Sequence, residues 1–264
     1  MRPRRSCSPR LGLPSANRLA RNYLGAVTDL RLQGPHTHHL RVPRTARYYT
    51  LGGSSSAPRA IWFVIHGYGQ LAGEFIRYFS DIAAEDVLVV APEAMNRFYL
   101  VSVAKTPARD RAVGATWMTR EDRASEIADY VEYLDALFDD VAREAVQSGA
   151  QVNVLGFSQG AATATRWVTH GHATLHRLVL WGGLIPPDSA LHGGQVALRN
   201  LPLTFVIGDK DHYIDDNLLA AERTRLDAAR VTYDVIRFEG GHNVDRRVFP
   251  KLLAADPRRE EANP

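Results

Sequence analysis

The sequence predicts an α/β fold in which a mostly parallel central sheet is flanked by helices. Two observations lead to this prediction. Apolar runs alternate with segments of helical periodicity along most of the 264 residues, which is the pattern of parallel strands joined by crossover helices. In addition, a Gly-x-Ser-x-Gly sequence at residues 156–160 ends one apolar run and opens a helical segment. A strand, a sharp turn and a helix in this order lift a serine clear of the edge of a sheet.

The apolar runs give seven expected strands, and the helical segments give five expected helices. The strands are expected over residues 45–51, 60–65, 87–91, 152–156, 177–182, 202–207 and 232–238. The helices are expected over residues 71–84, 120–147, 159–170, 216–229 and 244–254. The long second helix is the best supported, because Ile127, Val131, Leu134, Phe138 and Val141 recur at three- and four-residue spacing and so share one face. Thr119 and Asp122 predict a capping box that opens it.

The composition is that of a globular chain with one main domain. Hydrophobic residues make up 45% and charged residues 23% of the sequence, which are ordinary values. One cysteine, Cys7, excludes an intramolecular disulfide and favours a reducing cytoplasm. No run approaches the roughly 18 apolar residues of a membrane span, so no stable membrane insertion is expected.

The ends of the chain differ from its middle. Ten arginines and a single acid, Asp29, lie within residues 1–50. We expect residues 1–40 to be a disordered basic arm, or extra translated sequence, rather than a segment that binds nucleic acid or anionic lipid. His36, His38 and His39 lack acidic or cysteine neighbours, so no metal site is expected there. Residues 41–257 form the expected domain, and residues 258–264 form a polar tail.

The Gly-x-Ser-x-Gly turn is the nucleophile elbow of an α/β-hydrolase, which requires an acid and a histidine later in the chain. Ser158 is the expected nucleophile. Of the six histidines that follow it, His242 is favoured, because it lies in a glycine turn just after the apolar run at 235–238. Asp209 and Asp211 both lie in the loop after an expected strand. Asp211 is favoured because it fits the spacing Gly-x-x-Asp-x-x-aliphatic that ends at Ile214, whereas Asp209 is expected to brace the turn.

The expected oxyanion hole uses the loop after an earlier strand. The apolar run at residues 61–65 is followed at once by His66, Gly67, Tyr68 and Gly69. The backbone N–H groups of Tyr68 and Gln159 are the expected donors to the oxyanion. His66 is expected to hold the loop by hydrogen bonds rather than to act as a second base.

Four residues are expected to contact substrate. The segment from Pro92 to Met118 has no clear periodicity and follows a strand, where functional loops often lie. Trp117 either lines the substrate pocket there or packs against the elbow helix. The full set of expected contacts is Trp117, Met118, Leu184 and Ile214.

These motifs resemble the phospholipase/carboxylesterase family of α/β-hydrolases, which includes the acyl-protein thioesterases and small bacterial carboxylesterases. The matching pieces are residues 66–69, 156–160, 208–211 and 241–242, and residues 117–122 also look like a bacterial branch of predicted esterases. The resemblance spans roughly residues 45–255 and implies a triad of Ser158, Asp211 and His242. Two positions depart from the family pattern. Ala161 stands where a second glycine is frequent, and Gln70 stands where an acid is frequent.

Taken together, the sequence predicts a serine hydrolase that cleaves small-molecule esters or thioesters through an acyl-enzyme, with no metal and no organic cofactor. The stretch from Trp181 to Leu201 is short and broken by glycine and proline, so we expect an α/β-hydrolase fold with no large cap domain. Two alternatives remain open. One is a peptidase or lactonase on the same fold, and the other is a non-catalytic binding protein that retains a hydrolase pocket. The oligomeric state is not indicated.

Overall fold

A computed structural model describes residues 35–101, 107, 110–190 and 195–254 of the chain. The chain divides into two units, residues 1–44 and residues 45–264. Within the first unit, residues 35–44 are exposed and form neither helix nor strand. The domain boundaries expected from the sequence stay predictions.

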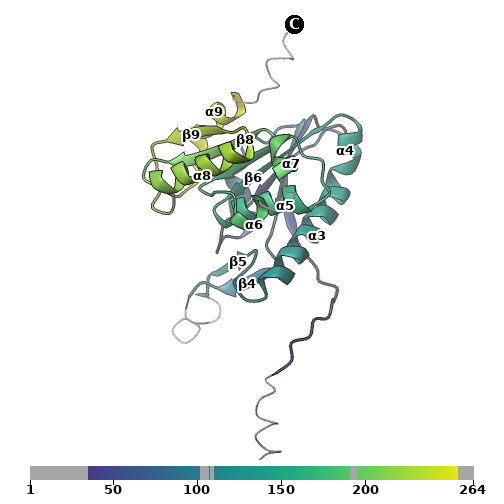
Figure 1. Ribbon diagram of the computed structural model, residues 1–264. Helices are drawn as coiled ribbons and strands as arrows, with labels where there is room; N and C mark the ends of the chain where they lie inside the picture. The colour runs from purple at the N-terminus through teal and green to yellow at the C-terminus, as the bar shows by residue number, and fades with distance from the viewer. Residues whose placement is uncertain (1–34, 102–106, 108–109, 191–194, 255–264) are drawn as a thin grey trace, which may run out of the picture. The chain divides into compact units, whose positions relative to one another are not determined.

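A seven-stranded sheet forms the centre of this unit (Figure 1). Its strands are β1 (Tyr48–Gly52), β2 (Ala60–Ile65), β3 (Val87–Pro92), β6 (Gln151–Phe157), β7 (Arg177–Trp181), β8 (Leu203–Gly208) and β9 (Asp234–Phe238). They are ordered β1-β3-β2-β6-β7-β8-β9. Only β1 runs antiparallel to its neighbour. The expected mostly parallel sheet is therefore confirmed, and each of the seven expected strands is found.

Helices cover both faces of the sheet. The helices are α2 (Ala72–Phe75), α3 (Arg123–Val141), α4 (Arg143–Gln147), α5 (Gln159–His170), α6 (Pro187–Ala190), α7 (Gln195–Arg199), α8 (Asp216–Ala229) and α9 (Phe249–Ala254), with 3₁₀ turns η1 (Ile76–Phe79) and η3 (Arg246–Val248). Side chains of β2 alternate between two cores, since Phe63 packs with residues of α3, α5 and α8, whereas Trp62 packs with residues of α2, η1 and α9. Burial on both faces explains why this strand is apolar at every position.

Three expected helices are shorter than the sequence pattern indicates. The helix expected over 244–254 is the 3₁₀ turn η3 followed by α9, which begins only at Phe249. The helix expected over 71–84 is one turn of α-helix followed by the 3₁₀ turn η1, which ends among aromatic residues of low helix propensity. The helix expected over 120–147 begins at Arg123 and breaks at Ala142, whose φ is −124°. Its apolar stripe faces the core as expected.

The expected capping box at Thr119 and Asp122 is wrong. Asp122 is the residue before the helix, but it has a left-handed backbone with φ of 43° and its side chain caps no N–H. The Thr119 hydroxyl instead accepts a hydrogen bond from the Glu121 N–H at 3.1 Å. The Thr119 N–H donates to the carboxylate of Glu126, one turn inside the helix. The box is therefore replaced by a wider turn that starts the helix later.

The segment between Pro92 and Met118, for which the sequence shows no periodicity, contains a second sheet. It is an antiparallel pair of β4 (Asn96–Tyr99) and β5 (Val113–Thr116). Between β7 and β8, the described residues form only the short helices α6 and α7, so no large cap is evident. No helix in the described ranges is long and apolar enough to cross a membrane.

Candidate active site

The elbow is the strained turn between β6 and α5. Ser158 has φ of 54° and ψ of −116°, a conformation that costs energy and is typical of functional turns. Glycines on both sides make the turn feasible. A Cβ on Gly156 would lie 2.2 Å from the carbonyl oxygen of Gly160, and a Cβ on Gly160 would lie 2.2 Å from that of Ile65. The spacing of the motif thus follows from close backbone approach.

Three side chains expected to act together form one hydrogen-bonded series. His242 Nε2 lies 2.9 Å from the Ser158 Oγ, and His242 Nδ1 lies 2.8 Å from Asp211 Oδ2. The residues follow β6, β8 and β9, whose carboxyl ends lie along the same edge of the parallel sheet. With the Nδ1 proton donated to the carboxylate, Nε2 is free to accept the serine proton.

The surroundings of the two candidate aspartates differ. The Asp211 side chain is 1% exposed. Its Oδ1 accepts the N–H groups of Tyr213 at 2.9 Å and Ile214 at 3.3 Å. The Asp209 side chain is 53% exposed, and its carboxylate lies 3.8 Å from Arg237. Only Asp211 contacts the histidine, while Asp209 N–H helps close the turn by donating to the Phe238 carbonyl.

Aromatic rings fix the orientation of His242. Phe157 lies 5.1 Å from the imidazole and Tyr213 lies 4.6 Å from it, measured between ring centroids. The Trp181 indole N–H donates to the carbonyl of Asn243, the next residue. These contacts limit rotation of the imidazole about its side-chain bonds.

His66 begins the loop after β2 and has a structural environment. It is fully buried, its Nδ1 bonds the Gly67 carbonyl at 2.8 Å, and its Nε2 accepts the Ala94 N–H at 3.1 Å. Burial lowers the pKa of His66 to about 4, so the ring is neutral near pH 7. Each nitrogen already has a partner, which agrees with a loop-holding role.

The two expected oxyanion donors lie on adjacent segments. The loop passes close to the serine, since a Cβ on Gly67 would lie 3.2 Å from the Ser158 Cβ. Among the described residues, the N–H groups of Tyr68 and Gln159 have no acceptor. For Gln159 this follows from its place as the first residue of α5.

A buried carboxylate anchors the far end of the same loop. Glu93 is fully buried at the end of β3, and its Oε2 accepts the N–H of Ala72, the first residue of α2, at 3.3 Å. Burial alone would raise the pKa of Glu93, but hydrogen bonds from Arg47 and Arg97 outweigh it and lower that pKa. Glu93 and Ala94 therefore hold the two ends of the loop. This role could not be predicted from the sequence, since a lone glutamate after a strand gives no signal of it.

The four expected substrate contacts lie in different surroundings. Trp117 is only 2% exposed, and its indole N–H donates to the His66 carbonyl at 2.9 Å. It thus packs in the core beneath the loop. Ile214 is also buried, whereas Met118 and Leu184 are half-buried.

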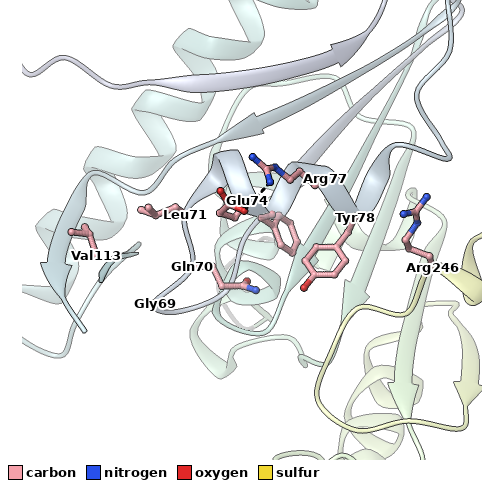
Figure 2. A pocket seen from close by; sticks show the side chains of 9 residues that line it. Gly69, Gln70, Leu71, Glu74, Arg77, Tyr78, Val113 and Arg246 are labelled. Atoms are coloured by element: carbon pink, nitrogen blue, oxygen red, sulfur yellow. Dashed lines mark ion pairs between the residues drawn. The ribbon is translucent and has the colours of Figure 1, made fainter. Parts of the chain in front are cut away.

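A cavity of about 500 Å³ adjoins the oxyanion loop (Figure 2). It is lined by Gly69, Gln70, Leu71, Glu74, Phe75, Arg77, Tyr78, Val113 and Arg246. Gln70, one of the lining residues, also holds the loop next to the serine, because its Oε1 accepts the Gly67 N–H at 2.8 Å. This cavity could not be predicted from the sequence, because its lining comes from three separate stretches of the chain.

Comparison with known proteins identifies the family. Residues 53–254 match the family model described as phospholipase/carboxylesterase. The chain belongs to this family. Membership makes it a carboxylesterase/thioesterase-type hydrolase and confirms the expected resemblance. No curated protein sequence matches the chain.

Solved structures share the α/β-hydrolase fold. Acyl-protein thioesterase 2 of Zea mays superimposes with a TM-score of 0.60 at 16% identity, covering 80% of this chain and 99% of that one. Esterase PE8 gives 0.56 at 20% identity, covering 80% and 97%. SOBER1 of Arabidopsis thaliana gives 0.56 at 18% identity, covering 76% and 99%.

Proposed function

We propose that this hydrolase cleaves carboxylic ester or thioester bonds by a serine mechanism, with Ser158 as nucleophile, His242 as base and Asp211 as its partner. The observation that supports this most directly is the unbroken series Ser158 Oγ–His242–Asp211, with separations of 2.9 Å and 2.8 Å. A non-catalytic binding protein would need neither the base nor the buried acid.

Acylation proceeds in two steps in this proposal. His242 Nε2 takes the serine proton as Oγ attacks the substrate carbonyl, and Asp211 stabilises the imidazolium. The negative charge moves to the carbonyl oxygen, which accepts hydrogen bonds from the N–H groups of Tyr68 and Gln159. As the tetrahedral intermediate collapses, His242 returns the proton to the leaving alcohol or thiol.

Deacylation reverses these roles with water. His242 removes a proton from water, whose oxygen attacks the acyl-serine carbonyl, and the carboxylic acid leaves as Ser158 regains its proton. The substrate is a small-molecule ester or thioester. The name of the maize neighbour, acyl-protein thioesterase 2, is the reason to include thioesters.

A fluorophosphonate probe tests the proposal. We expect intact-mass analysis to show one adduct on the wild type and none on Ser158→Ala. We also expect Ser158→Ala to lose about 10⁴–10⁶ in kcat on p-nitrophenyl butyrate. Ser148→Ala, which removes an exposed serine on another part of the chain, serves as the matched control. A Ser158→Ala variant that is still labelled, or still active, would overturn the proposed nucleophile.

A further inference from the structure

The strand β5 and the two residues after it contact both segments that carry the expected oxyanion donors. On one side, Ala115 pairs with the loop around Tyr68. The Gly69 N–H donates to the Ala115 carbonyl at 2.8 Å, and the Ala115 N–H donates to the Gln70 carbonyl at 3.2 Å. The loop is thereby hydrogen-bonded to the hairpin immediately after the Tyr68 donor.

On the other side, the end of β5 and the two residues after it form hydrogen bonds with the Gln159 side chain. Its Oε1 accepts the Trp117 N–H at 3.1 Å, and its Nε2 donates to the Met118 carbonyl at 2.9 Å and to the Thr116 Oγ1 at 2.9 Å. These hydrogen bonds are buried from solvent, since Thr116 is only 4% exposed. They fix the residue whose own N–H is the second expected donor.

Close packing leaves this arrangement little freedom. A Cβ on Gly114 would lie 2.4 Å from the carbonyl oxygen of Gly69 and 2.8 Å from its Cα. The Tyr68 ring also lies 5.2 Å from the ring of Phe98 on β4. The hairpin and the loop can approach this closely only because residue 114 has no side chain.

We propose that residues Gly114–Met118 form a template that sets the separation of the two oxyanion donors, and that Gly114 and Thr116 are positioning residues for the reaction. The inference rests on the proposed function, because it takes Tyr68 and Gln159 as the donors. Neither positioning residue touches the substrate. They act by holding two N–H groups at hydrogen-bond distance from one oxygen, where small displacements are costly.

Variants of Thr116 test the template without adding bulk. Thr116→Val removes the hydroxyl that bonds Gln159, and Thr116→Ser retains it. We expect Thr116→Val to lower kcat about tenfold with KM changed less than about twofold, and Thr116→Ser to recover most of the rate. Thr165→Val is the matched control, because Thr165 is a buried threonine of α5 whose hydroxyl donates within its own helix, to the Ala161 carbonyl.

A transition-state analogue separates positioning from general damage. An alkyl trifluoromethyl ketone adds to the nucleophile and places an oxyanion in the hole, whereas the matching methyl ketone binds without that charge. We expect Thr116→Val to reduce the affinity for the trifluoromethyl ketone by the same factor as kcat/KM. The affinity for the methyl ketone should be unchanged. Gly114→Ala should act in the same direction with a loss of about 100-fold.

The outcomes distinguish this inference from the function on which it rests. If Ser158 is labelled and required but Thr116→Val behaves like Thr165→Val in kcat and in ketone affinity, the template is wrong. An equal loss of affinity for both ketones would also overturn the template, since that result would mean that the whole pocket is distorted. If Ser158 is neither labelled nor required, the proposed function itself fails. Should Gly114→Ala not fold, the threonine variants still decide.

Discussion

At the scale of single residues, two aspartates in one loop differ mainly in what surrounds them. Asp211 is buried and bonded to His242, whereas Asp209 is half exposed near Arg237. We expect Asp211→Asn to lower kcat by about 10⁴, because the amide favours the wrong imidazole tautomer and leaves its cation unsupported. Asp209→Asn should change kcat less than about threefold.

Steady-state kinetics with an activated ester compare these two variants, and circular dichroism checks that both are folded. Equal losses, or a larger loss at Asp209, would show that the acid is misassigned.

The buried His66 makes stability depend on pH. Its pKa is about 4 in the folded protein and 6.5 when unperturbed. The unfolded chain therefore takes up a proton near pH 6.5, while the folded protein resists protonation until about pH 4. The contribution of His66 to the unfolding free energy is therefore constant above pH 6.5. It falls as the pH decreases toward 4, by up to about 3 kcal/mol.

Urea unfolding at pH 7, 5.5 and 4.5 measures this effect. His66→Gln keeps a side chain that hydrogen-bonds but cannot titrate, so its unfolding free energy should fall less over this range than that of the wild type. Parallel pH profiles for the two proteins would contradict the assignment.

At the scale of elements, the start of α5 is pressed against the end of β2. Because a Cβ on Gly160 would lie 2.2 Å from the Ile65 carbonyl oxygen, Gly160→Ala must push the helix away from the strand. We expect a loss of about 1–3 kcal/mol in unfolding free energy, together with reduced activity as the Gln159 N–H moves.

Urea denaturation and ester kinetics on the same preparation measure both effects. Gly73→Ala is a useful control, because the atoms nearest to a Cβ there belong to the side-chain ring of Tyr49, at 3.0 Å or more, and not to the backbone. Similar stabilities for the two variants would show that α5 shifts without cost.

Elements with a strong repeating pattern could be predicted from the sequence, and those set by distant contacts could not. The buried strands β2, β3 and β8 are runs of mainly apolar residues, so their positions could be predicted from the local sequence alone. The hairpin β4–β5 was missed because each strand has only four residues and 13 residues of sequence, 100–112, separate them. Its partners include Gly69 and Gln159, far away in sequence.

The candidate site divides in the same way. Ser158, Asp211 and His242 lie in local turn motifs that can be read from neighbouring residues. The roles of Glu93 and Thr116 depend on which segments the fold brings together, and no local pattern encodes that. Trp117 shows the limit most clearly, since an aromatic residue in a loop gives no indication of whether it is buried.

At the scale of the whole molecule, the unit formed by residues 45–264 has its own core. We expect a variant lacking residues 1–40 to retain esterase activity and thermal stability, because the arm has no apolar periodic face to bury. Differential scanning calorimetry and ester kinetics measure this. A loss of more than about 2 kcal/mol in unfolding free energy would show that the arm packs on the domain.

The absence of a large cap predicts a preference for short or medium acyl chains. Each methylene of the acyl chain adds about 0.8 kcal/mol to binding only while the pocket has apolar surface that buries it. Among the described residues between β7 and β8, α6 has four residues and α7 has five, too few to enclose a long chain. A p-nitrophenyl ester series from acetate to palmitate, corrected for micelles, should show kcat/KM levelling off. A steady rise to palmitate would contradict this expectation.

The order of the three active-site strands along the chain has a consequence for biosynthesis. Ser158 is made first, whereas Asp211 and His242 follow β8 and β9, and β9 forms one edge of the sheet. In the proposed mechanism, a ribosome-bound chain that stops before this edge carries Ser158 without the histidine that would activate it. We therefore expect prematurely terminated products to be inert toward cellular esters, and hydrolysis to begin only after β9 has joined the sheet.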